Sequence, residues 1–178
     1  MDTRTALVVI DLQLGVLEDC FDAAGVVART RTLVQRARIA DVPVVWVQHE
    51  EADMPHGSPS WQLAAGLAPT PDDARVFKTY CDTFADTPLR SVLDGWSVRR
   101  LVIAGAQSDY CIRTTAQRAA ADGYAVVLVS DAHTTTGSEF GGVALTGEQI
   151  VAHTNRYFAG LRYPGTSVGI ATHDAVAF

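Results

Sequence analysis

Short stretches of consecutive apolar residues recur along the chain, and segments of helical length separate them. Four of these stretches are rich in β-branched residues, and a polar residue or a glycine follows each: residues 7–10, 42–47, 101–104 and 125–129. Continuous apolar runs of this length are typical of strands that are buried on both faces of a parallel sheet. We expect a further, shorter strand over residues 75–77.

The intervening segments carry the spacing and the end signals of helices. Four helices are predicted, over residues 26–40, 88–96, 108–122 and 146–160. In the third, Ser108 is the expected N-cap and Gly123 the stop signal. In the fourth, Thr146 and Gln149 have the spacing of a capping box. Because strands and helices alternate, we predict an α/β fold with a three-layer α-β-α, Rossmann-like architecture, in which a doubly wound, mostly parallel sheet lies between helices.

Residues 50–73 follow neither pattern. Four prolines interrupt this segment, which is longer than a routine connection between two elements. We therefore expect either a lid over a site or a solvated excursion. No repeat and no linker divides the rest of the sequence, and the length suits a single core, so we predict one domain over residues 1–178.

Composition and charge narrow the class of partner. Hydrophobic residues make up 48% of the 178 positions, which is enough apolar content for a compact core, and the formal net charge is −6. An acidic surface repels nucleic acids and anionic membranes. The apolar runs are far shorter than the roughly 18 residues that span a bilayer, and Asp2 and Arg4 interrupt any signal-peptide core. We expect a cytoplasmic protein that binds a small molecule, with no nucleic-acid or membrane partner.

Three reactive side chains follow predicted strands, at the sheet edge where ligands bind in open α/β folds. Asp11 follows the first strand, Lys78 follows residues 75–77, and Cys111 lies a few residues after the strand at 101–104. Cys111 falls in the first turn of a predicted helix, where unpaired N–H groups and the helix dipole lower a thiol pKa. It is therefore the candidate nucleophile. The other two cysteines, Cys20 and Cys81, are predicted to be incidental.

Other assignments are compatible with the residues alone. Cys111 could be a buried structural cysteine, and Lys78 could lie at the surface as most lysines do. His133 also follows a strand and, with Asp131 and Cys111, would make a Cys/His/Asp arrangement.

A loose metal site is conceivable at three residues of the proline-containing region, His49, Asp53 and His56. No glycine-rich phosphate-binding turn follows the first strand, which disfavours a nucleotide-binding function.

Three segments in this order and spacing resemble the isochorismatase-like cysteine hydrolases, a superfamily that includes nicotinamidases, N-carbamoylsarcosine amidohydrolase and streptothricin hydrolase. The segments are residues 8–13, then Phe77 and Lys78 followed by Phe84 and Thr87, then residues 105–111 with Thr114 and Thr115. Asp131, Ala132 and residues 149–153 match as well. The likeness covers about residues 5–158 and implies the isochorismatase-like hydrolase fold.

The resemblance implies a catalytic triad of Asp11, Lys78 and Cys111, which favours Asp11 over His133 as the base. It also implies a non-proline cis peptide bond between Ala106 and Gln107, and an oxyanion hole made by the backbone N–H groups of Gln107 and Cys111. The implied reaction is the hydrolysis of a C–N bond in a small amide, lactam or ureido compound through a thioester. The resemblance further implies a homodimer or homotetramer.

The sequence departs from the nicotinamidases at the second strand, where the aspartate of their metal-binding Asp-x-His element is missing before His49. We therefore expect no metal and no cofactor. Six residues are candidates for the substrate pocket: Gln13, Leu17, Phe21, His49, Trp61 and Tyr110. Two other functions stay open, isochorismatase activity on a vinyl ether and a non-catalytic binding or thiol-sensor role.

Overall fold

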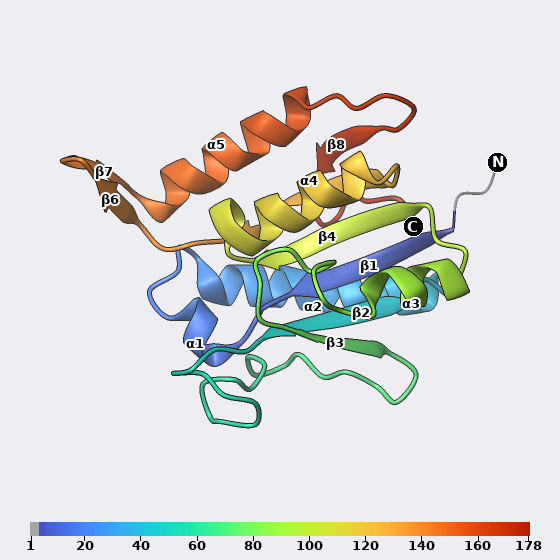
Figure 1. Ribbon diagram of the computed structural model, residues 1–178, viewed down its shortest axis with the longest axis horizontal. Coiled ribbons are helices and arrows are strands. Elements are labelled where there is room, and N and C mark those ends of the chain that lie inside the picture. The colour runs from blue at the N-terminus through green and yellow to red at the C-terminus, as the bar shows by residue number, and fades with distance from the viewer. Residues whose placement is uncertain (1–3) are drawn as a thin grey trace.

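A computed structural model describes residues 4–178 of the chain. Its centre is a six-stranded sheet with the order β3-β2-β1-β4-β5-β8, and every pair of neighbouring strands is parallel (Figure 1). The strands are β1 (Thr5–Ile10), β2 (Val44–His49), β3 (Ala74–Lys78), β4 (Arg100–Ala106), β5 (Ala125–Thr134) and β8 (Val168–Ala171). The strand order reverses between β1 and β4, and a crevice at such a reversal is where ligands bind in doubly wound sheets.

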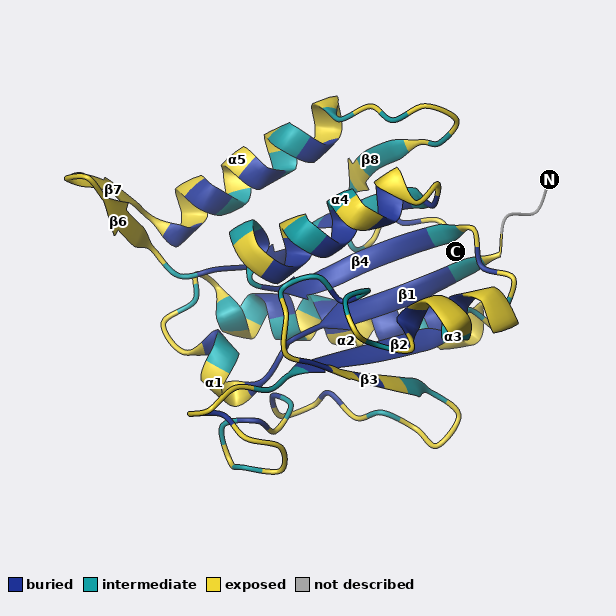
Figure 2. Cartoon of the chain, viewed as in Figure 1, coloured by how far each residue is buried: buried dark blue, intermediate teal, exposed yellow. Residues whose placement is uncertain are grey.

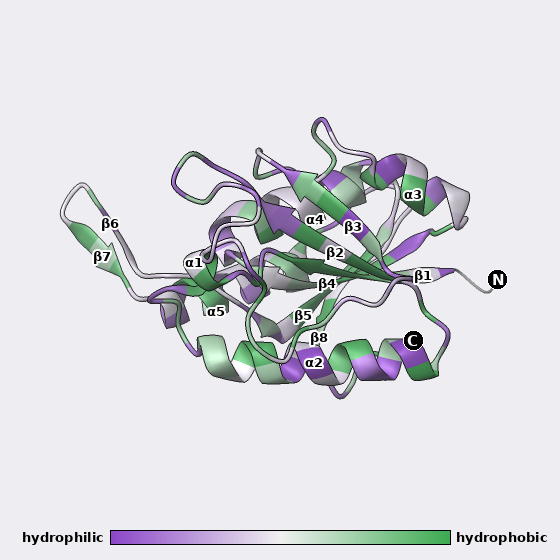
Figure 3. Ribbon diagram, turned by 90° about the horizontal axis from the view of Figure 1, so that it is seen from below, coloured by the Kyte–Doolittle hydropathy of each residue, from purple (hydrophilic) through white to green (hydrophobic). Residues whose placement is uncertain are grey.

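Helices cover both faces of this sheet. The helices are α1 (Leu14–Leu17), α2 (Ala23–Ile39), α3 (Leu89–Gly95), α4 (Arg113–Ala121) and α5 (Gly147–Gly160), and a π-helical turn, η1 (Ser108–Ile112), precedes α4. Helix α2 lies on one face, whereas α3 and α4 lie on the other (Figure 3). The three-layer α-β-α architecture predicted from the sequence is confirmed.

The central strands are buried because each of their faces meets a helix (Figure 2). On β1, Leu7 and Val9 pack with Leu33 of α2, whereas Val8 and Ile10 belong to the core on the other face. This alternation explains why the strand is apolar without a break, since a parallel sheet has no solvent-facing side.

The predicted helices are present, with one difference that matters for the site. The capping box of α5 is confirmed, because the Thr146 hydroxyl accepts from the Gln149 N–H and the Gln149 side chain accepts from the Thr146 N–H. The predicted N-cap at Ser108 is wrong. Gln107 is the cap, and Ser108 is buried in the first turn, where its hydroxyl bonds to His133 instead.

Part of the segment over residues 50–73 packs against the body of the protein, although most of its residues are exposed. Its backbone bonds to the segment after β1: Leu14 and Gly15 donate to the carbonyls of Gln62 and Ser60, and Ala64 donates to Leu12. It therefore lies beside the carboxyl ends of β1 and β2, as a lid would.

Four elements were not predicted from the sequence: α1, β8, and the strands β6 (Ser138–Phe140) and β7 (Val143–Leu145), which form a hairpin that projects from the body of the molecule (Figure 1). Within residues 4–178, no helix combines the length and the apolar character that crossing a membrane requires.

Candidate active site

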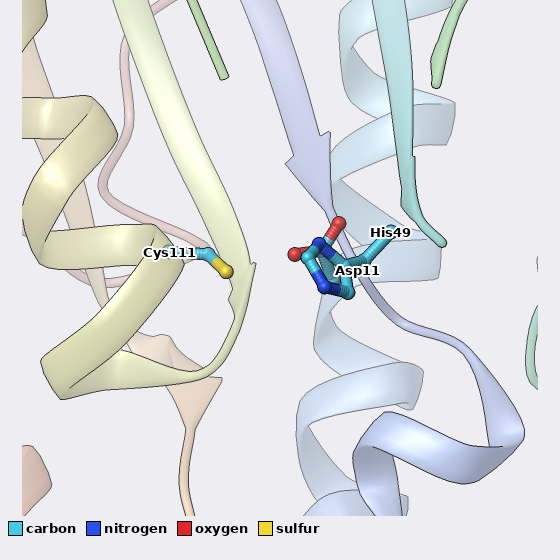
Figure 4. A group of neighbouring side chains, drawn as sticks. All are labelled: Asp11, His49 and Cys111. Carbon is cyan, nitrogen blue, oxygen red and sulfur yellow. The ribbon is translucent and has the colours of Figure 1, made fainter. Parts of the chain in front are cut away.

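The carboxyl ends of four neighbouring strands bring the candidate residues together. Asp11 directly follows β1, His49 ends β2, Lys78 ends β3, and Cys111 lies in η1 after β4. His49 and Lys78 are register partners across β2 and β3, so their backbones lie side by side. Asp11 and His49 lie close together, and the sulfur of Cys111 points toward them (Figure 4).

Lys78 is at the centre of this group. Its Nζ lies 2.6 Å from Asp11 Oδ2, 3.1 Å from His49 Nδ1 and 3.2 Å from Cys111 Sγ. The side chain of Lys78 is fully buried, and that of Asp11 is 1% exposed. The alternative of a surface lysine is therefore wrong. A buried ammonium needs an anionic partner, and Asp11 supplies it.

Burial and the ion pair set the charge states. Burial, the largest single effect, lowers the pKa of Lys78, but Asp11 and Cys111 together outweigh it, so the pKa of Lys78 is raised. For Cys111, burial and the Asp11 carboxylate raise the pKa of the thiol, against the opposing effect of Lys78. Burial, and then Lys78, lower the pKa of His49. The resting site therefore holds an Asp11–Lys78 ion pair, a neutral Cys111 thiol and a neutral His49.

The lowered pKa expected for Cys111 from its place in a helix is thus wrong for the resting protein. Cys111 is 8% exposed, and burial is the first cause of its raised pKa, followed by the Asp11 carboxylate. The carboxylate of Asp11 is the nearby group that could accept the thiol proton, since the ligand atoms of Asp11 and Cys111 lie within 4.8 Å of each other.

A tight backbone turn aims this cysteine at the ion pair. The peptide bond between Ala106 and Gln107 is cis, and Gly105 has a φ of +135°. A Cβ atom at position 105 would lie 1.9 Å from the carbonyl oxygen of Ile10, so only glycine lets β4 pass β1 this closely. The Gln107 side chain donates to the Val16 carbonyl at 3.2 Å and connects the turn to α1.

The rival Cys/His/Asp arrangement does not form. His133 is buried, its Nδ1 lies 2.7 Å from the Ser108 hydroxyl, and its Nε2 lies 3.0 Å from Asn155 Oδ1. The carboxylate of Asp131 binds the backbone N–H and the ring of His173. His133 thus holds the start of η1 in place and has no contact with the thiol.

The reactive group opens into a cavity of about 440 Å³. The residues that line it are Asp11, Gly15, Val16, Glu18, His49, Glu51, Asp53, Met54, Ser60, Cys81, Gln107, Tyr110 and Cys111. Of the six candidates for the pocket, His49 and Tyr110 line this cavity. Cys81, expected to be incidental, lines it too.

The other four candidates lie elsewhere. Leu17 and Phe21 line separate cavities beside α2. Trp61 is buried and packs against the rings of His56 and Phe77. Gln13 is buried, and its amide donates to the carbonyls of His49 and Trp61 and accepts from the His49 N–H. Gln13 and Trp61 thus fasten the proline-containing segment to β2.

A family model for the isochorismatase domain matches residues 5–149, which is most of the chain. The chain belongs to the isochorismatase family. It is 41% identical over 137 residues to a streptothricin hydrolase of Streptomyces noursei, an alignment that covers 73% of this chain and 49% of that protein. The chain thus spans about half the length of the streptothricin hydrolases it matches.

Solved structures of the isochorismatase family share this fold. One isochorismatase family protein superposes with a TM-score of 0.84 at 29% identity, over 95% of this chain and 98% of that one. A cysteine hydrolase from Pseudomonas syringae pv. phaseolicola superposes with a TM-score of 0.86 at 24% identity, over 96% and 89%. Both superpositions agree with the three-layer fold described above.

The isochorismatase-family site also shows which residues could hold a metal ion. His56 binds Glu50 at 2.6 Å and lies against Trp61, so His49, Asp53 and His56 do not converge. Among residues 4–178, the group that converges is Asp11, His49 and Cys111, whose ligand atoms lie within 4.8 Å of one another. The ammonium of Lys78 already contacts all three residues. A metal ion there would lie beside a second cation, so these residues do not fit one.

Proposed function

We propose that this protein is a cysteine-dependent hydrolase of a C–N bond in a small amide, lactam or ureido compound. The observation that carries the proposal is the buried ammonium of Lys78, which contacts both the Asp11 carboxylate and the Cys111 sulfur beside a cavity of about 440 Å³. A base, a cation and a nucleophile in contact are the groups that acyl transfer requires. The similarity to streptothricin hydrolases supports amide chemistry.

In the proposed first half-reaction, Asp11 takes the thiol proton as the Cys111 sulfur attacks the substrate carbonyl carbon. A C–S bond forms, and the carbonyl π electrons move to oxygen. The ammonium of Lys78 stabilises the negative charge on sulfur as the proton leaves. The oxyanion then collapses, the C–N bond breaks, and the nitrogen takes the proton from Asp11 and departs as ammonia or an amine.

The second half-reaction hydrolyses the thioester. Asp11, again a carboxylate, takes a proton from a water molecule whose oxygen attacks the thioester carbonyl. The C–S bond breaks, the sulfur recovers the proton from Asp11, and a carboxylic acid leaves. We assign stabilisation of both oxyanions to the backbone N–H groups of Gln107 and Cys111. Both residues line the cavity, and each such donor is worth about 2.7–4 kcal/mol in hydrolases.

The decisive experiment is an ammonia- and amine-release screen over nicotinamide, ureido acids, carbamoyl amino acids and lactam antibiotics. Cys111→Ala is the blank, and Cys20→Ala, which removes a thiol that does not line the cavity, is the matched control. We expect release that Cys111→Ala abolishes and Cys20→Ala retains. Near-normal turnover by Cys111→Ala would overturn the proposal.

A second candidate is the reaction after which the matching family model is named, cleavage of a vinyl ether by protonation. That chemistry does not need the thiol, so the same Cys111→Ala variant separates it from amide hydrolysis. Failure of every amide and of the vinyl ether would favour a non-catalytic binding or thiol-sensor role.

Location and assembly complete the proposal. We assign the protein to the cytoplasm on its sequence, with a small molecule as its partner. A homodimer or homotetramer is the assembly implied by the resemblance, and sedimentation velocity would show it as two or four times the chain mass of 19.0 kDa.

A further inference from the structure

The cavity beside Cys111 has an acidic wall. Among the described residues that line it are four carboxylates, on Asp11, Glu18, Glu51 and Asp53, and no lysine or arginine. Lys78, which is not among the residues that line the cavity, neutralises Asp11 through their ion pair. His49, the remaining basic group of the wall, has a lowered pKa, caused first by burial and then by Lys78. The cavity therefore carries an excess of negative charge.

The three outer carboxylates are available to a ligand. Glu18, Glu51 and Asp53 are exposed, and in residues 4–178 their side chains have no ion pair. Their neighbour Glu50 differs, because it binds His56 at 2.6 Å. Glu18 follows α1, whereas Glu51 and Asp53 lie in the segment after β2, so the acidic groups come from two separate parts of the chain.

A second observation, independent of these acids, also points to a ligand. The Oδ1 atom of Asp11 is buried and has no hydrogen-bond partner among the described residues, although Asp11 lines the cavity. A buried carboxylate oxygen without a donor is costly. Lys78 pairs with Oδ2 and the Cys111 thiol lies beside the carboxylate, and a ligand in the cavity can supply a further donor. The N–H of a substrate amide would supply it at the reacting end of the molecule.

We infer that the substrate carries a positive charge, as an ammonium or guanidinium group, at the end remote from the scissile C–N bond. Glu51 and Asp53, together with Glu18, determine this specificity. The inference rests on the proposed C–N hydrolase function and narrows it to cationic amides, lactams or ureido compounds. Carboxylate substrates, including carbamoyl amino acids and a vinyl ether of a dicarboxylic acid, would meet repulsion with no basic group in the wall to bind them.

Three amides of equal chain length test the charge preference. They are 6-aminohexanamide, a cation; hexanamide, which is neutral; and the monoamide of adipic acid, an anion. We expect kcat/KM for ammonia release to be highest for the cation and lowest for the anion, with a difference on the order of tenfold between neighbours in the series. Equal values, or a preference for the anion, would overturn the inference.

Variants with an amide in place of each carboxylate test whether Glu51 and Asp53 cause the preference for the cation. Glu51→Gln with Asp53→Asn should remove most of the preference for the cation, mainly by raising KM for 6-aminohexanamide, and should change kcat/KM for hexanamide much less than for 6-aminohexanamide. The matched control is Asp41→Asn with Glu139→Gln, which removes two exposed carboxylates outside the cavity. If the control pair loses the preference to the same extent, the effect belongs to overall charge and the assignment of Glu51 and Asp53 fails.

A binding measurement separates this inference from the proposed function. If no amide is hydrolysed, the C–N hydrolase proposal fails, and protection of Cys111 from iodoacetamide still reports which compound enters the cavity. Stronger protection by 6-aminohexanamide than by the adipic acid monoamide would uphold the charge preference without turnover. Equal protection by the two, or none, would overturn it.

Discussion

Lys78 shows how one residue can serve both the fold and the site. Its ammonium and the Asp11 carboxylate form an ion pair, 2.6 Å apart, with almost no exposure. Removing one partner of such a pair leaves an uncompensated buried charge, which costs about 3–5 kcal/mol. We therefore expect Lys78→Met to lower the free energy of unfolding by about that amount.

A double-mutant cycle tests whether the lost stability comes from the unpaired carboxylate of Asp11. Asp11 has a φ of +52°, which asparagine tolerates as well as aspartate does, so Asp11→Asn removes the charge and keeps the backbone. Lys78→Met combined with Asp11→Asn should be more stable in urea than Lys78→Met alone. The exposed pair of Arg99 and Asp94 is the control, and Arg99→Met should cost less than about 1 kcal/mol. Strict additivity of Lys78→Met and Asp11→Asn would contradict the prediction.

The raised pKa of Cys111 predicts how this thiol reacts. Burial and then the Asp11 carboxylate keep the proton on sulfur, and the thiolate is the form that iodoacetamide alkylates. As the pH rises, the thiolate fraction grows, so the alkylation rate at Cys111 should increase through pH 9 without reaching a plateau. Mass spectrometry of the peptide that contains Cys111 measures this rate, with free glutathione as the reference. A plateau below pH 7 would contradict the prediction, because it would show that Cys111 is already a thiolate at neutral pH, as its position in the first turn of a helix suggested.

At the scale of elements, Gly105 fixes how β4 ends and how η1 begins. A Cβ atom at Gly105 meets the backbone of Ile10 at 1.9 Å, and the φ of +135° is strained for any other residue. We expect Gly105→Ala to lower the free energy of unfolding by about 3 kcal/mol or more, since overpacking and backbone strain add. Gly123 is the matched control, with a φ of +91° and open space around it. Gly123→Ala should cost only the backbone strain, and an equal loss for both variants in thermal unfolding would contradict the steric explanation.

The elements also show what could be predicted from the sequence. The apolar runs predicted the four inner strands because a strand buried on both faces leaves a continuous pattern, as in β1 and β4. β8 is a short edge strand of half-buried residues, which leaves no such pattern. The β6–β7 hairpin had a signal that was missed, because Gly141 and Gly142 form a two-residue turn between two short strands.

The candidate site was only partly predictable for a similar physical reason. Asp11 and Cys111 lie at strand ends or helix starts, which periodicity locates. Glu51 and Asp53 lie in an irregular segment without periodicity, so their place beside the cavity depends on the backbone bonds that hold residues 60–64 against residues 12–15. The burial that raises the pKa of Cys111 is a property of the whole packed edge and leaves no mark in the local sequence.

At the scale of the whole molecule, the formal charge of −6 and the acidic cavity act in the same direction on a ligand. Both attract a cation over distances that salt screens, because the Debye length falls from about 30 Å at 0.01 M to about 3 Å at 1 M ionic strength. For 6-aminohexanamide, KM should therefore rise several-fold as sodium chloride increases across this range. The kcat should change little, since Glu18, Glu51 and Asp53 are assigned to binding and take no part in proton transfer. Hexanamide is the control, and its KM should stay constant. If salt raised KM equally for both amides, the ions would be acting on the protein in general, and electrostatic attraction of the substrate would have to be abandoned.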